Sequence, residues 1–308
     1  MNIKKLAKNL LPPIVIEAAK YATGKSPQKI LQHYLQNGRI PWSPGYRLYK
    51  TQLITQSISD NSMLERFRCG DPLPASYGYG IDERCIEYPW LFAHLPANAK
   101  RILDAGSVLN YNFILNNPIF DNKKLHILTL APEPKCFWQK EISYIYEDLR
   151  DIPIQNDYYD AIVCLSTLEH VGCDNTFYTL DKTFQEHHPE DFVLAMKEMC
   201  RVLKPGGILF ISVPFGVYHH FGMLQQFDKK LLNCVFKSFE FSKIIENYYK
   251  YTSEGWQIAA VDDCAKCEYV DWITTAWQHS DSKLPCPLPV EPDLAAAARA
   301  VACVQLIK

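Results

Sequence analysis

Residues 166–172 read STLEHVG, and His170 in this segment could act as a general base. A histidine has an ordinary pKa of about 6.5, so at neutral pH it can accept a proton from a reacting hydroxyl group. His219 and His220 offer the same chemistry later in the chain. Two interpretations of His170 stay open, because a histidine can also hold a loop in place through its hydrogen bonds.

A second segment, residues 104–110, reads DAGSVLN and combines an acid with small and hydrogen-bonding residues. Gly106 would let the backbone approach a ligand closely. Ser107 and Asn110 can donate or accept hydrogen bonds, and asparagine tolerates positive φ better than most residues. This composition is typical of a strand-to-helix turn, either one that contacts a ligand or a plain one.

Both segments follow apolar, β-branched runs that predict buried strands. We expect strands over residues 101–105, 125–130, 142–146, 161–166 and 208–213, and a last strand over residues 301–307. Such continuous runs are typical of strands that are covered on both faces, as in a parallel sheet. Ligands of a doubly wound sheet bind beyond the carboxyl ends of its strands. The turns after the strands are therefore the places to look for function.

Helices are expected between the strands. The clearest one begins near Pro189, carries an apolar stripe and is ended by Pro205-Gly206-Gly207. Asp293 could cap a further helix over residues 293–300, which read DLAAAARA. The pattern predicts an α/β fold with a doubly wound, mostly parallel sheet. Residues 1–75 form an N-terminal accessory extension of helices and loops in this interpretation, and residues 76–308 form the main domain.

The chain resembles the class I methyltransferases that use S-adenosylmethionine, over roughly residues 77–308. Three segments carry the resemblance, which read RILDAGSVLN (101–110), DAIVCLSTLEHVG (160–172) and MCRVLKPGGILFISVPFG (199–216). The resemblance implies a Rossmann-like methyltransferase fold and S-adenosylmethionine as the cofactor. The family typically has three glycines in the loop after the first strand. Here only Gly106 is present, and Val108 and Asn110 occupy the other two positions.

The resemblance also implies which residues bind the cofactor. Glu133 would bind the ribose, because a carboxylate can accept two hydrogen bonds from a diol. Asp148 would accept a hydrogen bond from the adenine amino group, and Leu149 would offer its backbone N–H to the ring. The expected cofactor-binding residues are Asp104, Gly106, Ser107, Asn110, Glu133, Asp148, Leu149, Ser166 and Thr167.

For the acceptor, the resemblance implies a site around the Leu-Glu-His turn and the segment before the first strand. His170 is the expected catalytic base, with His219 and His220 as its rivals, and Glu169 should face the acceptor. Arg84 could pair with a carboxylate of methionine or of the acceptor, and Tyr79 could stack on a ring. The alternative for these last two residues is a turn with solvated charges.

Composition limits the partners. The 308 residues carry 32 Lys and Arg against 34 Asp and Glu, a net charge of −2 that argues against nucleic-acid binding. The eleven cysteines are scattered and no signal peptide is recognisable, which predicts a reduced, cytoplasmic protein. Cys264 and Cys267 form a single C-x-x-C, whereas zinc needs four ligands, so no metal is expected. The basic N-terminal segment could contact an anionic membrane peripherally or pack as an ordinary helix.

We therefore expect an enzyme that transfers a methyl group from S-adenosylmethionine to an oxygen or nitrogen of a small-molecule or glycan-type acceptor. The alternative is a non-catalytic relative that has lost cofactor binding and serves as a binding module. A nicotinamide-dependent enzyme is excluded, because the sequence has no G-x-G-x-x-G motif.

Overall fold

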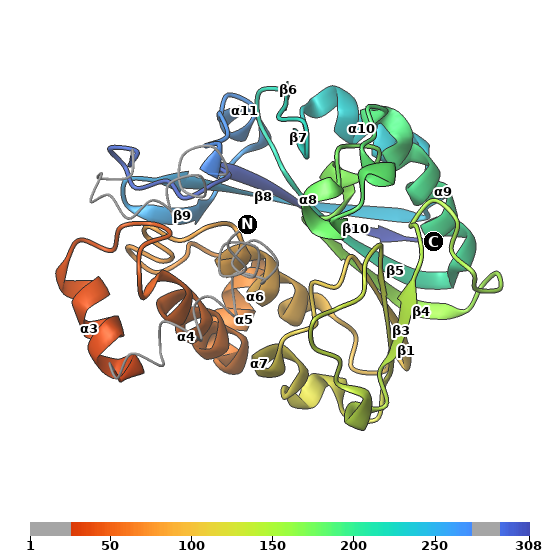
Figure 1. Cartoon of the computed structure of the whole chain (residues 1–308), viewed down its shortest axis with the longest axis horizontal. Helices are drawn as coiled ribbons and strands as arrows, with labels where there is room; N and C mark the ends of the chain where they lie inside the picture. The colour runs from red at the N-terminus through yellow and green to blue at the C-terminus, as the bar shows by residue number, and fades with distance from the viewer. Residues whose placement is uncertain (1–25, 273–289) are drawn as a thin grey trace, which may run out of the picture.

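The computed structural model describes residues 26–272 and 290–308, and its centre is a sheet of eight strands (Figure 1). The strand order is β3-β2-β1-β4-β5-β10-β8-β9. Strands β1 to β5 are parallel, whereas β10 is antiparallel to both β5 and β8, and β9 is antiparallel to β8. The mostly parallel, doubly wound α/β sheet is confirmed. The strands are β1 (Arg101–Ala105), β2 (Lys124–Thr129), β3 (Ser143–Tyr146), β4 (Tyr159–Leu165), β5 (Leu203–Pro214), β8 (Lys243–Thr252), β9 (Gly255–Ile258) and β10 (Ala300–Ile307).

Side chains alternate between two cores because successive residues of a strand point to opposite faces. Ile102 and Val163 belong to one core, and their neighbours Leu103 and Ile162 belong to the other. The first core is covered by the helices before β1, and the second by the two helices that flank β5 in the sequence (Figure 1). The principal helices are α3 (Pro27–Gln36), α4 (Tyr46–Ser59), α5 (Asn61–Cys69), α6 (Arg84–His94), α9 (Phe192–Val202) and α10 (Lys229–Lys237).

One helix boundary and one whole expected helix differ from the structure. Helix α9 ends at Val202, before the Pro-Gly-Gly sequence, because strand β5 already begins at Leu203 beside Tyr159 of β4. The expected helix over residues 293–300 is wrong. Most of that segment is coil, and Asp293 instead accepts hydrogen bonds from Arg299 and from the backbone of Ala295. Tertiary packing overrides the helix propensity of the alanines, which are buried in the core.

The helices before residue 75 share a core with the sheet. Buried side chains of α3, α4 and α5 belong to the same hydrophobic cluster as β1 and β4. Asp82 is buried and joins the two regions, since it accepts hydrogen bonds from Tyr46 (2.8 Å) and Lys50 (2.6 Å) of α4. Burial alone would raise the pKa of Asp82, but Lys50 and Tyr46 hold it below its usual value. The domain division at residue 75 stays a prediction.

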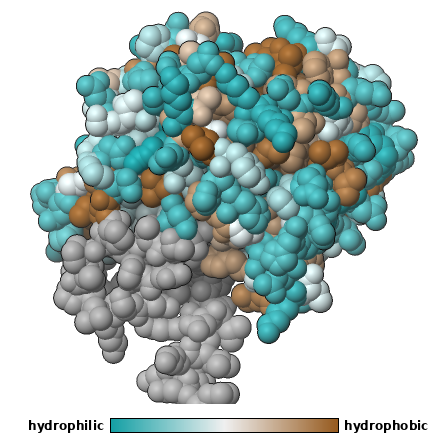
Figure 2. Space-filling model, turned by 90° about the horizontal axis from the view of Figure 1, so that it is seen from above, coloured by the Kyte–Doolittle hydropathy of each residue, from teal (hydrophilic) through white to brown (hydrophobic). Residues whose placement is uncertain are grey.

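The surface seen in Figure 2 is mostly hydrophilic outside the grey region, with apolar residues in scattered groups. Within residues 26–272 and 290–308, no helix combines the length and apolar character that crossing a bilayer requires. The basic N-terminal segment, on which the expected membrane contact depends, lies outside the described residues.

Candidate functional site

Asp104 at the end of β1 organises the loop that follows. Its carboxylate accepts hydrogen bonds from the backbone N–H groups of Val108 (3.0 Å) and Leu109 (2.7 Å). The side chain is fully buried, and this burial raises its pKa to about 7 although the two N–H donors oppose the shift. Asp104 therefore shapes the loop after β1 through these two hydrogen bonds.

Gly106 faces the turn after β4. It adopts a φ of +116°, and a Cβ atom added there would overlap the side chain of Thr167. The two loops that were expected to bind the cofactor thus pack against each other. Ser107 also has positive φ (61°), and its Oγ is buried without a hydrogen-bond partner among the described residues. A buried, unsatisfied hydroxyl in this loop is what a site for a polar ligand would present.

Asn110 connects the loops that follow β1 and β2. Its Nδ2 donates to the carbonyl oxygen of Lys135 (3.0 Å), and its Oδ1 accepts from the hydroxyl of Tyr144 (2.9 Å). Glu133 lies nearby, since its charge contributes, after burial, to the raised pKa of Tyr144. Asn110 therefore stabilises the edge at which Glu133 was expected to bind a ribose.

Asp148 after β3 already has a cationic partner. Arg150 donates to both of its carboxylate oxygens through Nε (3.0 and 3.1 Å) and Nη2 (2.7 Å). Arg150 also pairs with Glu186 (2.6 Å) and Asp191 (2.9 Å) of the insert between β4 and α9. Adenine would have to share the Asp148 carboxylate with Arg150, and Leu149 beside it is buried. The adenine-binding role of this pair stays a prediction.

Glu87 of α6, which the sequence did not reveal, connects this helix to the sheet. It bonds to a serine directly after β4 and to a serine of β5. It is completely buried, and its Oε1 accepts from the hydroxyls of Ser166 and Ser212, the latter at 2.6 Å. Its Oε2 pairs with Arg84 Nη1 (3.0 Å), which also donates to the Leu165 carbonyl (3.1 Å). The cofactor-binding role of Ser166 stays a prediction, since its hydroxyl is engaged by Glu87. An acid in an otherwise apolar helical stretch was the signal that could have revealed Glu87.

Glu169 lies in the short helical turn Leu168–His170 that follows β4. Only 3% of its surface is exposed, and its Oε2 has no hydrogen-bond partner in the described part of the chain. Burial raises its pKa well above the usual value for a carboxyl group. A buried acid without a partner is costly and needs an explanation, such as a ligand that supplies the missing partner.

His170 is held in one orientation. Its Nδ1 lies 2.7 Å from the carbonyl oxygen of Met223, and the ring of Tyr178 packs edge-on against it at 5.4 Å. Because a carbonyl oxygen only accepts, Nδ1 carries the proton and Nε2 keeps its lone pair. Burial lowers the pKa of His170 to about 4, so the imidazole is neutral at physiological pH.

His219, His220 and Tyr79 lie farther from the turn after β4 than His170 does. His219 and His220 form strand β6 (His219–His220), which pairs with β7 (Gln225–Gln226). His220 comes near the Glu169 turn, with Nε2 3.6 Å from Cys173 Sγ, and burial lowers its pKa. Tyr79 lies in a turn whose neighbours hydrogen-bond to Tyr251 and Trp256 of β8 and β9, away from β1 and β4. His170, Glu169 and Arg84 are thus brought together, whereas Tyr79 is not.

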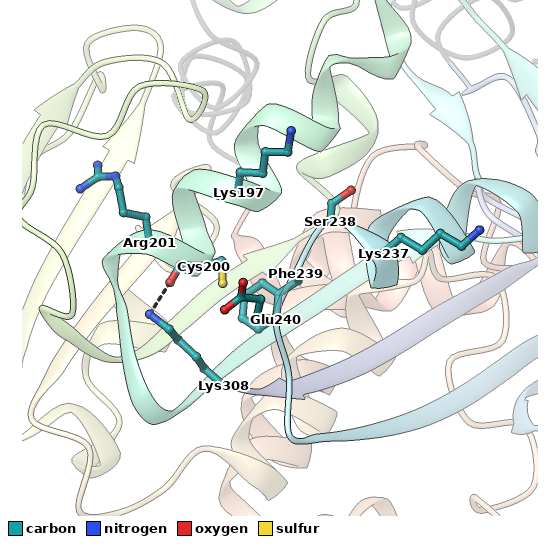
Figure 3. A pocket seen from close by; sticks show the side chains of 8 residues that line it. All are labelled: Lys197, Cys200, Arg201, Lys237, Ser238, Phe239, Glu240 and Lys308. Carbon is teal, nitrogen blue, oxygen red and sulfur yellow. Dashed lines mark hydrogen bonds between the residues drawn. The ribbon is translucent and has the colours of Figure 1, made fainter.

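A pocket of about 420 Å³ lies beside the amino end of β5, away from the carboxyl ends of the strands that carry the candidate site (Figure 3). Its walls come from the ends of α9 and α10 and from Lys308, which donates to the Cys200 carbonyl at 2.9 Å. Because β10 is antiparallel to β5, Lys308 lies at the amino end of β5, away from the loops that bind ligands in such folds. Among the described residues no cluster of His, Cys, Asp and Glu could hold a metal ion.

Comparison with known proteins finds a family match within the sheet. Residues 127–211, from β2 into β5, match the methyltransferase domain family. The matched segment lies within the part of the chain whose sequence resembles the class I methyltransferases that use S-adenosylmethionine. No curated protein matches the sequence. Solved structures that the chain resembles include an S-adenosylmethionine-dependent methyltransferase of Archaeoglobus fulgidus, with 11% identity, 80% of this chain and 100% of that chain covered, and a TM-score of 0.43.

A second similar structure is the 1,6-didemethyltoxoflavin N1-methyltransferase of Burkholderia thailandensis, solved with 1,6-didemethyltoxoflavin and S-adenosylhomocysteine. It shares 13% identity over 71% of this chain and 75% of that chain, with a TM-score of 0.41. At this level of identity the two structures do not identify a methyl acceptor for the chain. The cofactor of the family is S-adenosylmethionine. The Ser107 hydroxyl and Glu169 Oε2, both buried and without a partner among the described residues, fit a polar ligand at this edge of the sheet.

Proposed function

We propose that the protein transfers a methyl group from S-adenosylmethionine to an oxygen or nitrogen of a small-molecule or glycan-type acceptor. The observation that carries this proposal is the state of His170. Its Nδ1 proton is fixed on the Met223 carbonyl at 2.7 Å, so Nε2 can accept a proton at the carboxyl end of β4.

The loops after β1 and β4 would hold the cofactor. Ser107 would donate its unpartnered hydroxyl to it, and Thr167 would shape the surface above Gly106. Glu133 would accept from the ribose, as the sequence suggests. When bound, S-adenosylmethionine supplies an already activated methyl group, so the protein mainly has to position the acceptor and remove a proton.

His170 would perform the proton removal. The Met223 carbonyl keeps the ring in the tautomer whose Nε2 is a base, and Tyr178 holds the ring plane. The low pKa of His170, about 4, keeps the imidazole neutral and Nε2 unprotonated at physiological pH, and it makes this ring a weaker base than an exposed imidazole. His219 and His220 remain rivals, because His220 lies beside the same turn.

The loops beyond the strands carry exposed apolar side chains, which suits an acceptor with an apolar part. Exposed apolar side chains often mark a binding site where several of them form one patch. The exposed residues in these loops include Tyr111, Trp138, Phe177, Tyr178 and Tyr218.

The non-catalytic alternative has support of its own. The carboxylates of Asp104 and Asp148 are already bonded inside the protein, and two family glycines are missing. The decisive experiment is a thermal shift with S-adenosylhomocysteine, followed by a metabolite screen with labelled donor. At a hundred times its dissociation constant, the ligand should add about 2.7 kcal/mol of stability. The absence of both a shift and label transfer would favour the binding module.

A further inference from the structure

The guanidinium group of Arg84 is fixed on one side and open on the other. Its Nη1 donates to Glu87 Oε2 (3.0 Å) and to the carbonyl oxygen of Leu165 (3.1 Å). Its Nε and Nη2 have no hydrogen-bond partner among the described residues, and 25% of the side chain is exposed. A guanidinium group has five N–H donors, so Nε and Nη2 keep three of them for a ligand.

The open side of Arg84 is the edge that binds carboxylates elsewhere in this chain. Arg150 donates to the two oxygens of Asp148 through Nε (3.0 Å) and Nη2 (2.7 Å). Arg201 donates to the two oxygens of Glu198 through the same two atoms, at 2.8 and 2.6 Å. Two parallel N–H groups match the two oxygens of one planar carboxylate, which makes such pairs strong and specific. Arg84 presents this edge without a carboxylate of the described chain on it.

Helix α6 places Arg84 at the carboxyl ends of the central strands. Leu165, whose carbonyl oxygen binds Arg84, is the last residue of β4. One helical turn farther along α6, the hydroxyl of Tyr88 donates to the carbonyl oxygen of Val108 (2.5 Å) in the loop after β1. The loops after β1 and β4 also pack against each other. Ligands of doubly wound sheets bind beyond these strand ends, so the open edge lies where a ligand is expected.

The acids near Arg84 leave its open edge available to an anion. The carboxylate of Glu87 is already bonded to Arg84 Nη1 and to two serine hydroxyls. Burial raises the pKa of Glu83 to about 8 and the pKa of Glu169 well above its usual value. The carboxyl groups of Glu83 and Glu169 are therefore mostly protonated at neutral pH and do not repel a bound carboxylate.

We propose that Arg84 binds a carboxylate group of a ligand through its Nε and Nη2 atoms. This inference rests on the function proposed above, and it assigns one binding contact of that site. Two ligands can supply the group, namely the amino-acid end of S-adenosylmethionine and a methyl acceptor that carries a carboxylate. Glu87 and the Leu165 carbonyl fix the orientation of the guanidinium group, so the edge is formed before the ligand arrives.

The test uses two pairs of ligands whose members differ in a carboxylate. The first pair is S-adenosylhomocysteine and its decarboxylated analogue. The second pair is phenylacetate and 2-phenylethanol, measured with and without S-adenosylhomocysteine. Calorimetry is done on the wild type, Arg84→Gln and Arg84→Lys, of which the last keeps a positive charge beside Glu87 but lacks the two-donor edge.

Arg68→Gln is the matched control. Arg68 also pairs with a glutamate three positions away, but its side chain is 48% exposed and lies on α5. Its substitution should leave both ligand pairs unchanged.

We expect the wild type to bind the carboxylate member of one pair about tenfold or more tightly than the other member, as a charged hydrogen bond would give. Both Arg84 variants should lose this preference and keep their affinity for the member without the carboxylate. A loss confined to the first pair assigns the contact to the cofactor, and a loss confined to the second pair assigns it to the acceptor.

Two results would overturn the inference. These are no carboxylate preference of the wild type in either pair, and a preference that Arg84→Lys retains in full. Urea unfolding checks that each variant is folded, and Arg84→Lys keeps the test readable if Arg84→Gln does not fold. Failure of the wild type to bind S-adenosylhomocysteine and its analogue would instead contradict the proposed methyl transfer, and the second pair measured without that ligand would still report on Arg84.

Discussion

Arg150 Nη2 lies 2.7 Å from Asp148 Oδ2, so the acid expected to bind adenine belongs to an ion-pair network. The same guanidinium reaches Glu186 and Asp191, and its side chain is 21% exposed. The network therefore ties the loop after β3 to the insert before α9. Any role of Asp148 in binding must be separated from its role in this network.

We expect Asp148→Asn to weaken S-adenosylhomocysteine binding by about 1–3 kcal/mol if its carboxylate accepts from the adenine. Arg150→Met should destabilise the fold by about 1–3 kcal/mol, because three carboxylates lose a charged donor. Calorimetry measures the first change and urea unfolding the second. Lys229→Met is the matched control, since its pair with Asp262 is exposed and should contribute little. Unchanged affinity in a folded Asp148→Asn variant would remove Asp148 from the site.

His170→Ala should lower turnover by about 10²–10⁴-fold with cofactor affinity almost unchanged, because the variant lacks the group that accepts the proton. Rates and S-adenosylhomocysteine affinity of this variant should be measured beside those of His219→Ala and His220→Ala. Full activity in His170→Ala together with loss in a β6 variant would transfer the role to that strand. From the sequence alone, the pH–rate profile should show the ionisation of His170 near neutral pH. Burial lowers the pKa of His170 to about 4 in the unliganded protein, so this ionisation should appear at a lower pH.

The low pKa of His170 also predicts how stability depends on pH. The unfolded chain titrates this histidine near its ordinary value of about 6.5, whereas the folded protein does so at about 4. The unfolded state therefore binds the proton first as the pH falls. Stability from His170 is complete above about pH 6.5 and is lost as the pH falls towards 4. Urea unfolding across this range should show a steeper decline in the wild type than in His170→Gln, and equal slopes would contradict the burial of the ring.

Gly106→Ala should destabilise the protein and weaken cofactor binding together. The new Cβ would overlap Thr167, and φ at this position is +116°. Gly206→Ala and Gly222→Ala are matched controls, since both have positive φ but open space around the added atom. They should cost only about 1 kcal/mol, the strain of positive φ alone. Equal effects in urea unfolding at all three positions would show that Thr167 moves aside freely.

Glu87→Ala should cost about 3–5 kcal/mol of stability, because it leaves Arg84 without its buried partner. Two serine hydroxyls would lose their acceptor as well. Glu87→Gln keeps an acceptor for the hydroxyls and should be milder in urea unfolding. Similar free energies of unfolding for the wild type and Glu87→Ala would mean that the network contributes nothing to the fold.

The sequence alone determined the strands and the edge of the sheet that carries the candidate site. The apolar run over residues 161–165 before Ser166 was long enough to specify a buried strand, and the shorter Ile102-Leu103 before Asp104 fitted a second one. Parallel strands bring their carboxyl ends to one edge. The turns containing Gly106 and His170 were placed at that edge for this local reason. The family resemblance added the cofactor, which no residue pattern by itself names.

Only the tertiary structure decided what surrounds those turns. Glu87 comes from a helix before the sheet, and Ser212, its partner, lies 125 positions later in the sequence. The pairing of Asp148 with Glu186 through Arg150, the contact of His170 with Met223 and the isolation of Glu169 depend likewise on distant segments. Burial and charge at a site are sums over neighbours in space, and a linear sequence does not state which neighbours meet. Local periodicity therefore predicts elements, whereas the protonation state and partners of a side chain follow from packing.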